Sequence, residues 1–494
     1  MLEFPHMKFS LKIGDLSQAS VEAILTFAWE DGWSAQTEGI DREIGGILKK
    51  EVISRGFEAK PGKILLTHSL GKIPAEKVFL VGLGKKDELT PYQVRKIFAG
   101  VFRRLKEEAI ATLAFANIAD LDLVQAAVEG FLLGSYKFLK YKSEETKEKQ
   151  TDEVEVTIFV KDANQLVSAK EKITRGEIFS EATIFARDLV NEPASVTTPT
   201  YLANLAQKLG KTAGFSCKIY EKEQLEKLGM GAFLGVARGS DEPAKFIKLE
   251  YKNGRKKIVL VGKGITFDTG GLSLKKQEEM QNMKMDMAGA AAILAIFSVI
   301  DKIRPKVHLI GLLPATENMP SGKALKPGDI VKALSGKTIE VVNTDAEGRL
   351  ILADALSFGT SLKPDLMIDL ATLTGACRVA LGEEIAGIFS TEEEFSQKLK
   401  EAAWEVGEKF WQMPLEIDYK ELLKSEIADI KNITGKKYGG AITAALFLQE
   451  FVGITSWIHL DIAGPAWQEK ETDLIPQGGS GFGVRTILNF LANL

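Results

Sequence analysis

The sequence predicts an α/β protein whose larger, C-terminal part contains a central, mostly parallel sheet flanked by helices. Short apolar runs alternate with helical patterns along nearly the whole chain, which is the order of elements expected for this fold class. In the second half these runs are mainly apolar rather than alternating, as in strands that are buried on both faces. The length of 494 residues predicts more than one domain, since an ordinary domain has roughly 100–200 residues.

Residues 1–165 predict a smaller α/β domain. The run AEKVFLVGLG, residues 75–84, is typical of a strand that ends in a tight turn. A helix is expected from Thr90, because Pro91 suits the first helical position. ATLAFAN and EVEVTIFV predict two more strands. The dense charges of residues 140–153 indicate a solvated surface loop.

A long helical pattern covers residues 167–190 and stops in NEPASVTTP, where two prolines break the period. We therefore place the domain boundary along this helix. The prediction is an N-terminal α/β domain over residues 1–165, a connecting helix and linker over 166–195, and a larger domain over 196–494.

Four apolar runs in the larger domain predict buried parallel strands, with helical patterns between them. They cover residues 256–264, 306–315, 364–375 and 456–464. The Ala-rich run after Met287 indicates a buried helix. Ligands of such sheets bind beyond the carboxyl ends of the strands, and the polar residues of interest lie at or after these ends.

Composition excludes several classes of protein. Lys and Arg number 63 against 67 Asp and Glu, so no excess of positive charge suggests nucleic acid or an anionic membrane. No apolar run reaches the ~18–20 residues that span a bilayer, and the first residues, MLEFPHMKFSLKIGDL, do not predict a signal peptide. Two distant cysteines make no disulfide framework, which favours a cytoplasmic protein. The four histidines are scattered, so a bound metal would need mainly carboxylate ligands.

Three segments carry charges beside glycines or apolar residues, where an unpaired charge is costly to bury. Their charged residues are Lys263, Asp268 and Lys275, then Asp286, and finally Asp345, Glu347 and Arg349. Carboxylate oxygens in this number suit Mg²⁺, Mn²⁺ or Zn²⁺, and four carboxylates can hold two ions. The pattern therefore favours a two-metal hydrolase.

Other interpretations stay open for single residues. Asp268 could form a turn before Gly270, and Asp345 could make a helical ion pair with Arg349. A phosphate-binding loop is disfavoured: Gly336-Lys337-Thr338 has the end of that motif, but Val331 stands at the position of its first glycine.

The same segments resemble the leucyl aminopeptidase family, the M17 metallopeptidases. The resemblance runs from about residue 187 to the C-terminus, through RDLVNEPASVTTP, GVARGSDEPAKFIKLEY, ENMPSGKALKPGD, NTDAEGRLILADAL, IDLATLTGA, ADIKN, YGGAITAALFLQEF and HLDIAGPAW. Residues 1–165 resemble the family's N-terminal domain only loosely. The resemblance implies a catalytic two-metal peptidase domain over residues 196–494 with a central mixed sheet, and a homohexamer.

The resemblance also implies roles for individual residues. Two divalent ions, Mn²⁺ or Zn²⁺, would be held by Lys263, Asp268, Asp286, Asp345 and Glu347. Lys275 would polarise the scissile carbonyl, and Arg349 would hold a bicarbonate ion that acts as general base toward a metal-bridging water. Substrate would be bound by Met283, Asn343, Thr372, Leu373, Gly375, Ala463 and Ala466.

The sequence departs from the family pattern at three places without losing a metal or catalytic position. Thr269 stands where Ser is frequent, and Ala288 where Gly is usual. Lys276 and Gln277 follow Lys275 where Pro is frequent, which could alter the mobility of that loop.

We therefore expect a metal-dependent aminopeptidase that acts on peptides with Leu-like N-terminal residues. One alternative is a hexameric DNA-binding accessory role, because some relatives of the family bind DNA; the net charge of −4 makes nucleic acid an unlikely partner. Another is a different two-metal hydrolase such as a phosphatase. Lys263 and Lys275 would suit phosphate, but the small or apolar pocket residues argue against it.

Overall fold

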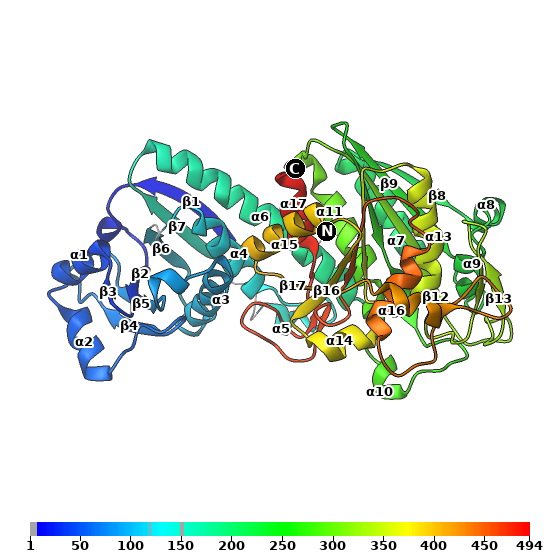
Figure 1. Ribbon diagram of the computed structural model, residues 1–494. Helices are drawn as coiled ribbons and strands as arrows, with labels where there is room; N and C mark the ends of the chain where they lie inside the picture. The colour runs from blue at the N-terminus through cyan, green and yellow to red at the C-terminus, as the bar shows by residue number, and fades with distance from the viewer. Residues whose placement is uncertain (1–6, 117, 119, 149–152) are drawn as a thin grey trace. The chain divides into compact units, whose positions relative to one another are not determined.

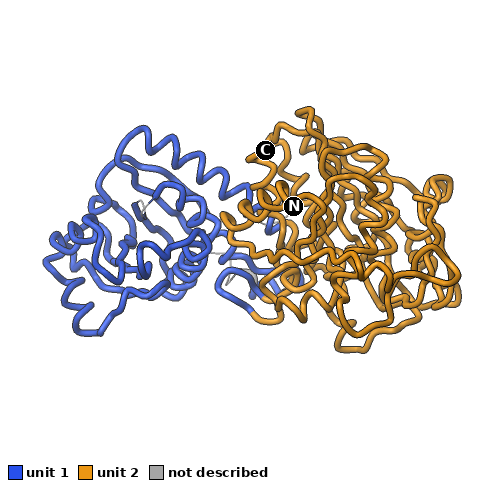
Figure 2. The backbone as a smooth tube through the Cα atoms, in the orientation of Figure 1, with its two compact units in different colours: residues 1–184, 471–476 blue, residues 185–470, 477–494 orange. Residues whose placement is uncertain are grey.

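The computed structural model describes residues 7–116, 118, 120–148 and 153–494. The chain divides into two compact units, shown in Figure 2. The first comprises residues 1–184 and 471–476, and the second comprises residues 185–470 and 477–494. The division falls within one long helix, α6 (Ala163–Asn191). Assignment of residues 471–476 to the first unit was not foreseen, because a boundary drawn along the sequence cannot show a returning segment.

The first unit is an α/β domain (Figure 1). Its described residues form a seven-stranded sheet of order β1-β7-β6-β2-β5-β4, with β3 paired to β2. The strands are β1 (Met7–Ile13), β2 (Ala23–Trp29), β3 (Gly32–Trp33), β4 (Ile64–His68), β5 (Lys77–Gly82), β6 (Thr112–Ala116) and β7 (Val154–Val160). The helices are η1 (Leu16–Gln18), α1 (Ala35–Glu43), α2 (Ile47–Arg55), η2 (Lys86–Glu88), α3 (Pro91–Glu107), α4 (Leu123–Ser135) and α5 (Glu144–Glu148).

Local signals predicted this unit well. Strands β5, β6 and β7 lie where the apolar runs placed them, and Gly84 has a positive φ of 79° in the turn after β5. Helix α3 begins after Thr90, whose Oγ accepts a hydrogen bond from Gln93 N while the Gln93 side chain accepts one from Thr90 N. The prediction of a surface loop over residues 140–153 was wrong in one respect, because these residues include the short helix α5. Residues 149–152 lie outside the described part.

The second unit contains, over its described residues, a nine-stranded sheet of order β17-β16-β19-β15-β10-β12-β9-β8, with β11 paired to β12. Its strands are β8 (Ser216–Tyr220), β9 (Lys245–Lys252), β10 (Lys257–Gly262), β11 (Gly264–Asp268), β12 (His308–Asn318), β15 (Leu366–Ala371), β16 (Ile385–Ser390), β17 (Lys409–Gln412) and β19 (Trp457–Asp461). The four predicted strands, β10, β12, β15 and β19, are adjacent and parallel. Antiparallel β9 and β16 flank them and make the sheet mixed, so the predicted fold class is confirmed.

The remaining elements of the second unit are helices and small strands (Figure 1). The helices are α7 (Pro199–Thr212), α8 (Lys222–Leu228), α9 (Gly231–Ala237), α10 (Gln277–Met280), η3 (Met283–Met287), α11 (Ala288–Ser298), α12 (Ile300–Ile303), α13 (Gly348–Ser361), α14 (Gly375–Leu381), α15 (Glu393–Val406), η4 (Ile417–Leu423), α16 (Gly440–Gln449) and α17 (Val484–Ala492). The small strands are β13 (Ile330–Lys332), β14 (Thr338–Glu340), β18 (Ile430–Lys431), β20 (Trp467–Gln468) and β21 (Gly478–Gly479).

The central strands are mainly apolar because both of their faces are covered. Val259 and Val261 of β10 pack in one core with residues of α13 and α16. Ile258 and Leu260 alternate with them, so they point to the opposite face, and they are equally buried. Helix α11, predicted from its Ala-rich run, is buried from Ala288 to Phe297. Within the described ranges, every helix is too short or too polar to span a bilayer.

Parallel strands bring their carboxyl ends to one edge of the sheet. Lys263 follows β10, Thr372 follows β15, and Asp461 is the last residue of β19. In the ladder between β15 and β19, Ala371 pairs with Asp461, so the segments that leave these strands begin side by side. This edge carries the predicted site.

Candidate metal centre

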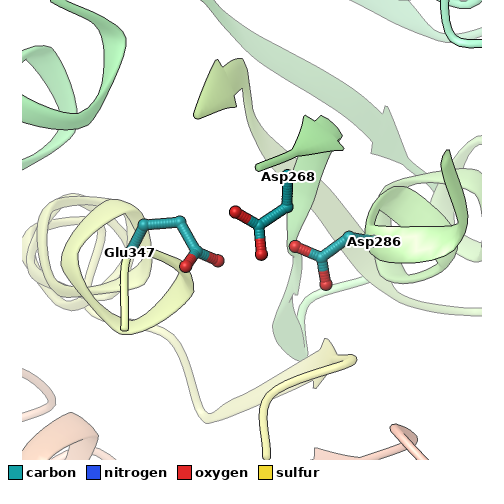
Figure 3. Close-up of side chains that lie close together, drawn as sticks. All are labelled: Asp268, Asp286 and Glu347. Carbon is teal, nitrogen blue, oxygen red and sulfur yellow. The ribbon is translucent and has the colours of Figure 1, made fainter. Parts of the chain in front are cut away.

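Three carboxylates from distant segments converge beside the sheet. Asp268 ends β11, Asp286 lies in η3, and Glu347 immediately precedes α13. Each is buried, and one oxygen of each lies within 4.8 Å of an oxygen of the other two. Figure 3 shows the three carboxyl groups pointing toward one another. This donor set could hold a metal ion.

Two lysines lie among these carboxylates. Lys263 Nζ is 2.7 Å from Asp286 Oδ1 and 3.1 Å from Glu347 Oε1. Lys275 Nζ is 2.9 Å from Asp268 Oδ2 and also forms an ion pair with Asp345. All five residues proposed as metal ligands, together with Lys275, are therefore in one connected cluster. Its four carboxylates outnumber its two ammonium groups, so the cluster has an excess of negative charge.

Burial and charge shift the pKa values in this cluster. Burial raises the pKa of Asp286 and of Asp268, and the negative charge of Glu347 adds to both effects. Burial alone would lower the pKa of Lys263, but the charges of Asp286 and Glu347 raise it above its ordinary value. Crowded carboxylates of this kind favour any added positive charge, whether a proton or a metal cation.

Some acceptor oxygens of the cluster are not used in hydrogen bonds with the described residues. Among the described residues, Asp286 Oδ2 and Glu347 Oε2 are buried and have no hydrogen-bond partner. Leaving a buried charged oxygen without a partner is costly, and such atoms are rare in native proteins. A cation bound between these oxygens would remove that cost. The residues present thus fit a metal centre.

Asn318, at the end of β12, holds the two halves of the site together and was missed in the sequence. Its Nδ2 donates to Asp268 Oδ1 at 2.8 Å and to the carbonyl oxygen of Thr344 at 3.1 Å. The backbone N–H of Gly270 donates to the same Asp268 oxygen at 2.8 Å. Asp268 is therefore fixed by hydrogen bonds before any metal binds. The available signal was one polar residue at the end of an apolar run.

Thr372 touches the cluster directly. Its Oγ donates to Asp286 Oδ1 at 2.6 Å, and its carbonyl oxygen accepts from Lys263 Nζ at 2.9 Å. Thr372 was predicted to bind substrate; in the structure it positions two of the proposed metal ligands.

Asn432 supports the segment that contains Glu347 and was also missed. It is fully buried, and its side chain accepts from Val342 N at 2.8 Å and donates to the carbonyl oxygen of Asn343 at 2.7 Å. The Asn343 side chain in turn accepts from Asp345 N at 2.8 Å, which closes a turn. Asn432 lies in the ADIKN segment, where the sequence gave no chemical reason to single it out.

Arg349 is buried in the first turn of α13. Its Nη1 donates to the carbonyl oxygen of Asn432 at 2.7 Å, and its Nε is buried with no hydrogen-bond partner among the described residues. Burial lowers its pKa from the ordinary value. The helical ion pair weighed for Asp345 and Arg349 does not describe this geometry, because Asp345 pairs with Lys275. A buried guanidinium with a free donor is suited to a planar anion.

The other residues predicted to bind substrate follow two neighbouring strands or lie in η3. Leu373 and Gly375 follow β15, Ala463 and Ala466 follow β19, and Met283 begins η3. Leu373 N and Ala463 N donate to the same oxygen, Asp461 Oδ1, each at 3.2 Å. One carboxylate therefore joins the two segments that follow the strands.

Both parts of the chain match the domains of one known protein family. Residues 184–488 match the catalytic domain of the cytosol aminopeptidase family, and residues 25–145 match its N-terminal domain. The probable cytosol aminopeptidase of Alkaliphilus metalliredigens (strain QYMF) is 41% identical over 492 residues, covering 97% of this chain and 98% of the relative.

Solved structures of an aminopeptidase and a related enzyme are similar to this chain as well. A mutant of tomato leucine aminopeptidase is 33% identical with a TM-score of 0.89, and the match covers 100% of this chain and 98% of that one. The bottromycin maturation enzyme BotP in complex with Mn is 34% identical with a TM-score of 0.84, over 96% of this chain and 99% of that one.

The fold and the buried acidic cluster define a metal-dependent hydrolase. The chain belongs to the cytosol aminopeptidase family, M17, and is a metal-dependent aminopeptidase. The resemblance noted in the sequence is thereby confirmed.

Proposed function

We propose that this aminopeptidase removes Leu-like apolar residues from the N-termini of peptides and uses two divalent ions, Mn²⁺ or Zn²⁺. The observation that carries the proposal is the cluster of four carboxylates, three of them buried, around two lysines, with two carboxylate oxygens left without partners among the described residues. The BotP neighbour with Mn supports the choice of metal, and the tomato leucine aminopeptidase supports the choice of substrate.

The ions would be held by Lys263, Asp268, Asp286, Asp345 and Glu347. Bound divalent ions lower the pKa of water and polarise a carbonyl group. Lys263 can be a ligand only as a neutral amine, so loading of the site must release its proton. Until then, its ion pairs with Asp286 and Glu347 hold it in place.

Lys275 and Arg349 would act on the substrate and on the proton. The Lys275 ammonium lies against Asp268 and Asp345 at the centre, where it can stabilise negative charge that develops on the scissile carbonyl oxygen. Arg349 would hold a bicarbonate ion at its free guanidinium edge, which would serve as general base. The guanidinium cannot be that base itself, because it stays protonated.

The substrate's first side chain would lie against small or apolar residues. We assign this pocket to Met283, Thr372, Gly375, Ala463 and Ala466, and the rest of the substrate-binding surface to Asn343 and Leu373. Such surroundings offer no partner for a charged side chain, which is the basis for the proposed preference.

The decisive experiment compares hydrolysis of Leu-p-nitroanilide and Gly-p-nitroanilide with Mn²⁺ or Zn²⁺, before and after chelation. Activity should disappear on chelation, return with metal, and favour Leu. Full activity of the metal-free protein, or equal rates for both substrates, would contradict the proposal.

We also propose a cytoplasmic homohexamer. The family name of the relatives supports the compartment, and the resemblance supports the assembly. Native mass together with bound-metal content tests both the assembly and the number of ions: six chains and two ions per chain are expected. A monomer, or one ion per chain, would overturn the corresponding part.

A further inference from the structure

Asp461 is a fully buried carboxylate outside the proposed metal ligands. It ends β19, and its side chain makes four hydrogen bonds to two segments of the chain. Its Oδ1 accepts from the backbone N–H groups of Leu373 at 3.2 Å, Thr374 at 3.4 Å and Ala463 at 3.2 Å. Its Oδ2 accepts from Thr374 Oγ at 2.7 Å. It lies in the segment HLDIAGPAW, but no role was predicted for it from the sequence.

The two segments that Asp461 joins are the ones assigned to substrate binding. Thr372, Leu373 and Gly375 lie on the first, which follows β15, and Ala463 and Ala466 lie on the second. The strands themselves end at Ala371 and Asp461, so beyond them the ladder no longer holds the segments together. The Asp461 carboxylate continues the connection by side-chain bonds to backbone.

The same contacts extend to the metal centre and to α14. Thr374 Oγ accepts from Cys377 N at 3.0 Å and so caps α14. Two residues earlier, Thr372 bonds Asp286 and Lys263. A shift of the segment after β15 would therefore move the proposed pocket wall, and it would be felt at Asp286.

A carboxylate is the group that this position requires. All four partners of Asp461 are donors, and an ionised carboxylate accepts at both oxygens. Thr374 Oγ has one proton, which it gives to Asp461 while it accepts from Cys377 N. In an Asp461→Asn variant one of the two atoms becomes an NH₂ donor. It would face either the three backbone N–H groups or the Thr374 hydroxyl, so one side is mismatched.

We propose that Asp461 is a positioning residue that sets the selectivity for the substrate's N-terminal side chain by joining the two walls of its pocket. The inference rests on the proposed function, since it uses the proposed pocket and the preference for Leu. Asp461 does not touch substrate or metal in this scheme. It acts through the segments that carry Leu373 and Ala463.

The test measures kcat and KM for Leu-p-nitroanilide and Gly-p-nitroanilide with the Mn²⁺-loaded wild type, Asp461→Asn and Asp354→Asn. Asp354 is a matched control: it is fully buried and accepts backbone N–H groups from Phe233 at 2.8 Å and Leu334 at 2.7 Å. In Asp461→Asn the Leu-to-Gly ratio of kcat/KM should fall about tenfold, mainly through a higher KM for Leu, since pocket contacts of this size give discrimination of that order. Asp354→Asn should keep the wild-type ratio.

A second pair of variants covers the case in which Asp461→Asn fails to fold. Thr374→Val removes the hydroxyl that Asp461 binds, whereas Thr374→Ser keeps it. Thr374→Val should lose selectivity for Leu, and Thr374→Ser should restore most of it. Equal ratios in these two variants would overturn the proposal.

Each remaining outcome also bears directly on the inference. A folded Asp461→Asn with the wild-type ratio overturns the inference while leaving the proposed function intact. An equal loss in Asp354→Asn means general loosening of the fold and overturns it as well. A wild type that does not prefer Leu overturns the proposed substrate preference and this inference together.

Discussion

Each unit buries charged side chains, but the two sites differ in charge balance. In the first unit, Arg95 Nε is 2.6 Å from Glu129 Oε2, with both side chains almost fully buried, and Gln125 donates to the other Glu129 oxygen at 2.8 Å. This ion pair joins one positive and one negative side chain. In the second unit, four carboxylates surround Lys263 and Lys275, and buried carboxylate oxygens remain without partners.

The comparison separates a structural ion pair from a binding site. Burial of a charge by itself shows only that the charge is compensated, as it is at Glu129. An excess of one sign, with unsatisfied atoms, indicates that added positive charge, from a proton or a metal cation, completes the compensation. The contrast predicts opposite consequences when equivalent residues are changed in the two units.

The largest effect is expected for Glu347→Gln. Removing this carboxylate charge should lower activity about 1,000-fold or more, ~4 kcal/mol of transition-state stabilisation, because metal ions supply several kcal/mol there. The number of bound metal ions should fall by at least one per chain. Elemental analysis of the purified variant, with Leu-p-nitroanilide kinetics, measures both. Wild-type metal content with wild-type activity would show that the excess charge does not mark the centre.

Glu129→Gln should lower the stability of the first unit and leave metal binding and activity unchanged. The change removes the carboxylate charge that pairs with buried Arg95, and breaking a buried pair costs about 3 kcal/mol or more. Urea denaturation, monitored by hydrogen exchange of first-unit amides, should show this loss of stability. Metal content and kcat of the folded protein should match the wild type. A loss of bound metal in this variant would remove the distinction between the two clusters.

Metal affinity should increase with pH. Burial raises the pKa of Asp286 and Asp268, so protons occupy the metal-free site at pH values where free carboxyls are ionised. A cation must displace these protons, and affinity should rise up to about tenfold per pH unit for each proton released. Calorimetric titration with Mn²⁺ at pH 6, 7 and 8 tests this, and buffers of different ionisation enthalpy count the protons. An affinity independent of pH would contradict it.

The same pKa shifts determine the direction in which the stability of the metal-free protein changes with pH. A carboxyl whose folded pKa is raised stabilises the fold at low pH, and that contribution is lost as pH rises through the folded pKa. The metal-free protein should therefore lose thermal stability at this site as pH rises from about 4, where free carboxyls ionise, to the raised folded pKa of Asp268, about 6, and of Asp286, about 8. Mn²⁺ should restore that stability by binding the folded state.

Much of the fold was predictable because its signals are local. The strands β10, β12, β15 and β19 are recognisable in the sequence as mainly apolar runs, since both faces are buried. Thr90 and Pro91 mark a helix start by chemistry confined to a few residues. The antiparallel strands β9 and β16 gave no such signal, because strand direction depends on where the chain returns.

The candidate site was predictable only in its charged residues. Asp268, Asp286 and Glu347 attracted attention because each is a charge in apolar or glycine-rich surroundings. Asn318, Asn432 and Asp461 did not, because their roles depend on partners that lie distant in sequence: Asn318 bonds Asp268, 50 residues away. A polar residue at a strand end does not reveal which backbone group it will face.

The smallest effect is expected at the segment 471–476, which belongs to the first unit although it lies close to the C-terminus. Asp473 forms an ion pair with Arg103 at 2.6 Å, and both side chains are well exposed. Because exposed pairs contribute roughly 0.2–1 kcal/mol, Asp473→Ala should speed hydrogen exchange in α3 only slightly. Adding about 0.5 M salt to the wild type should have a similar small effect through screening. Metal content and kcat should not change. A destabilisation as large as that of Glu129→Gln would mean that this exposed pair contributes as much to the stability of the first unit as the buried pair does.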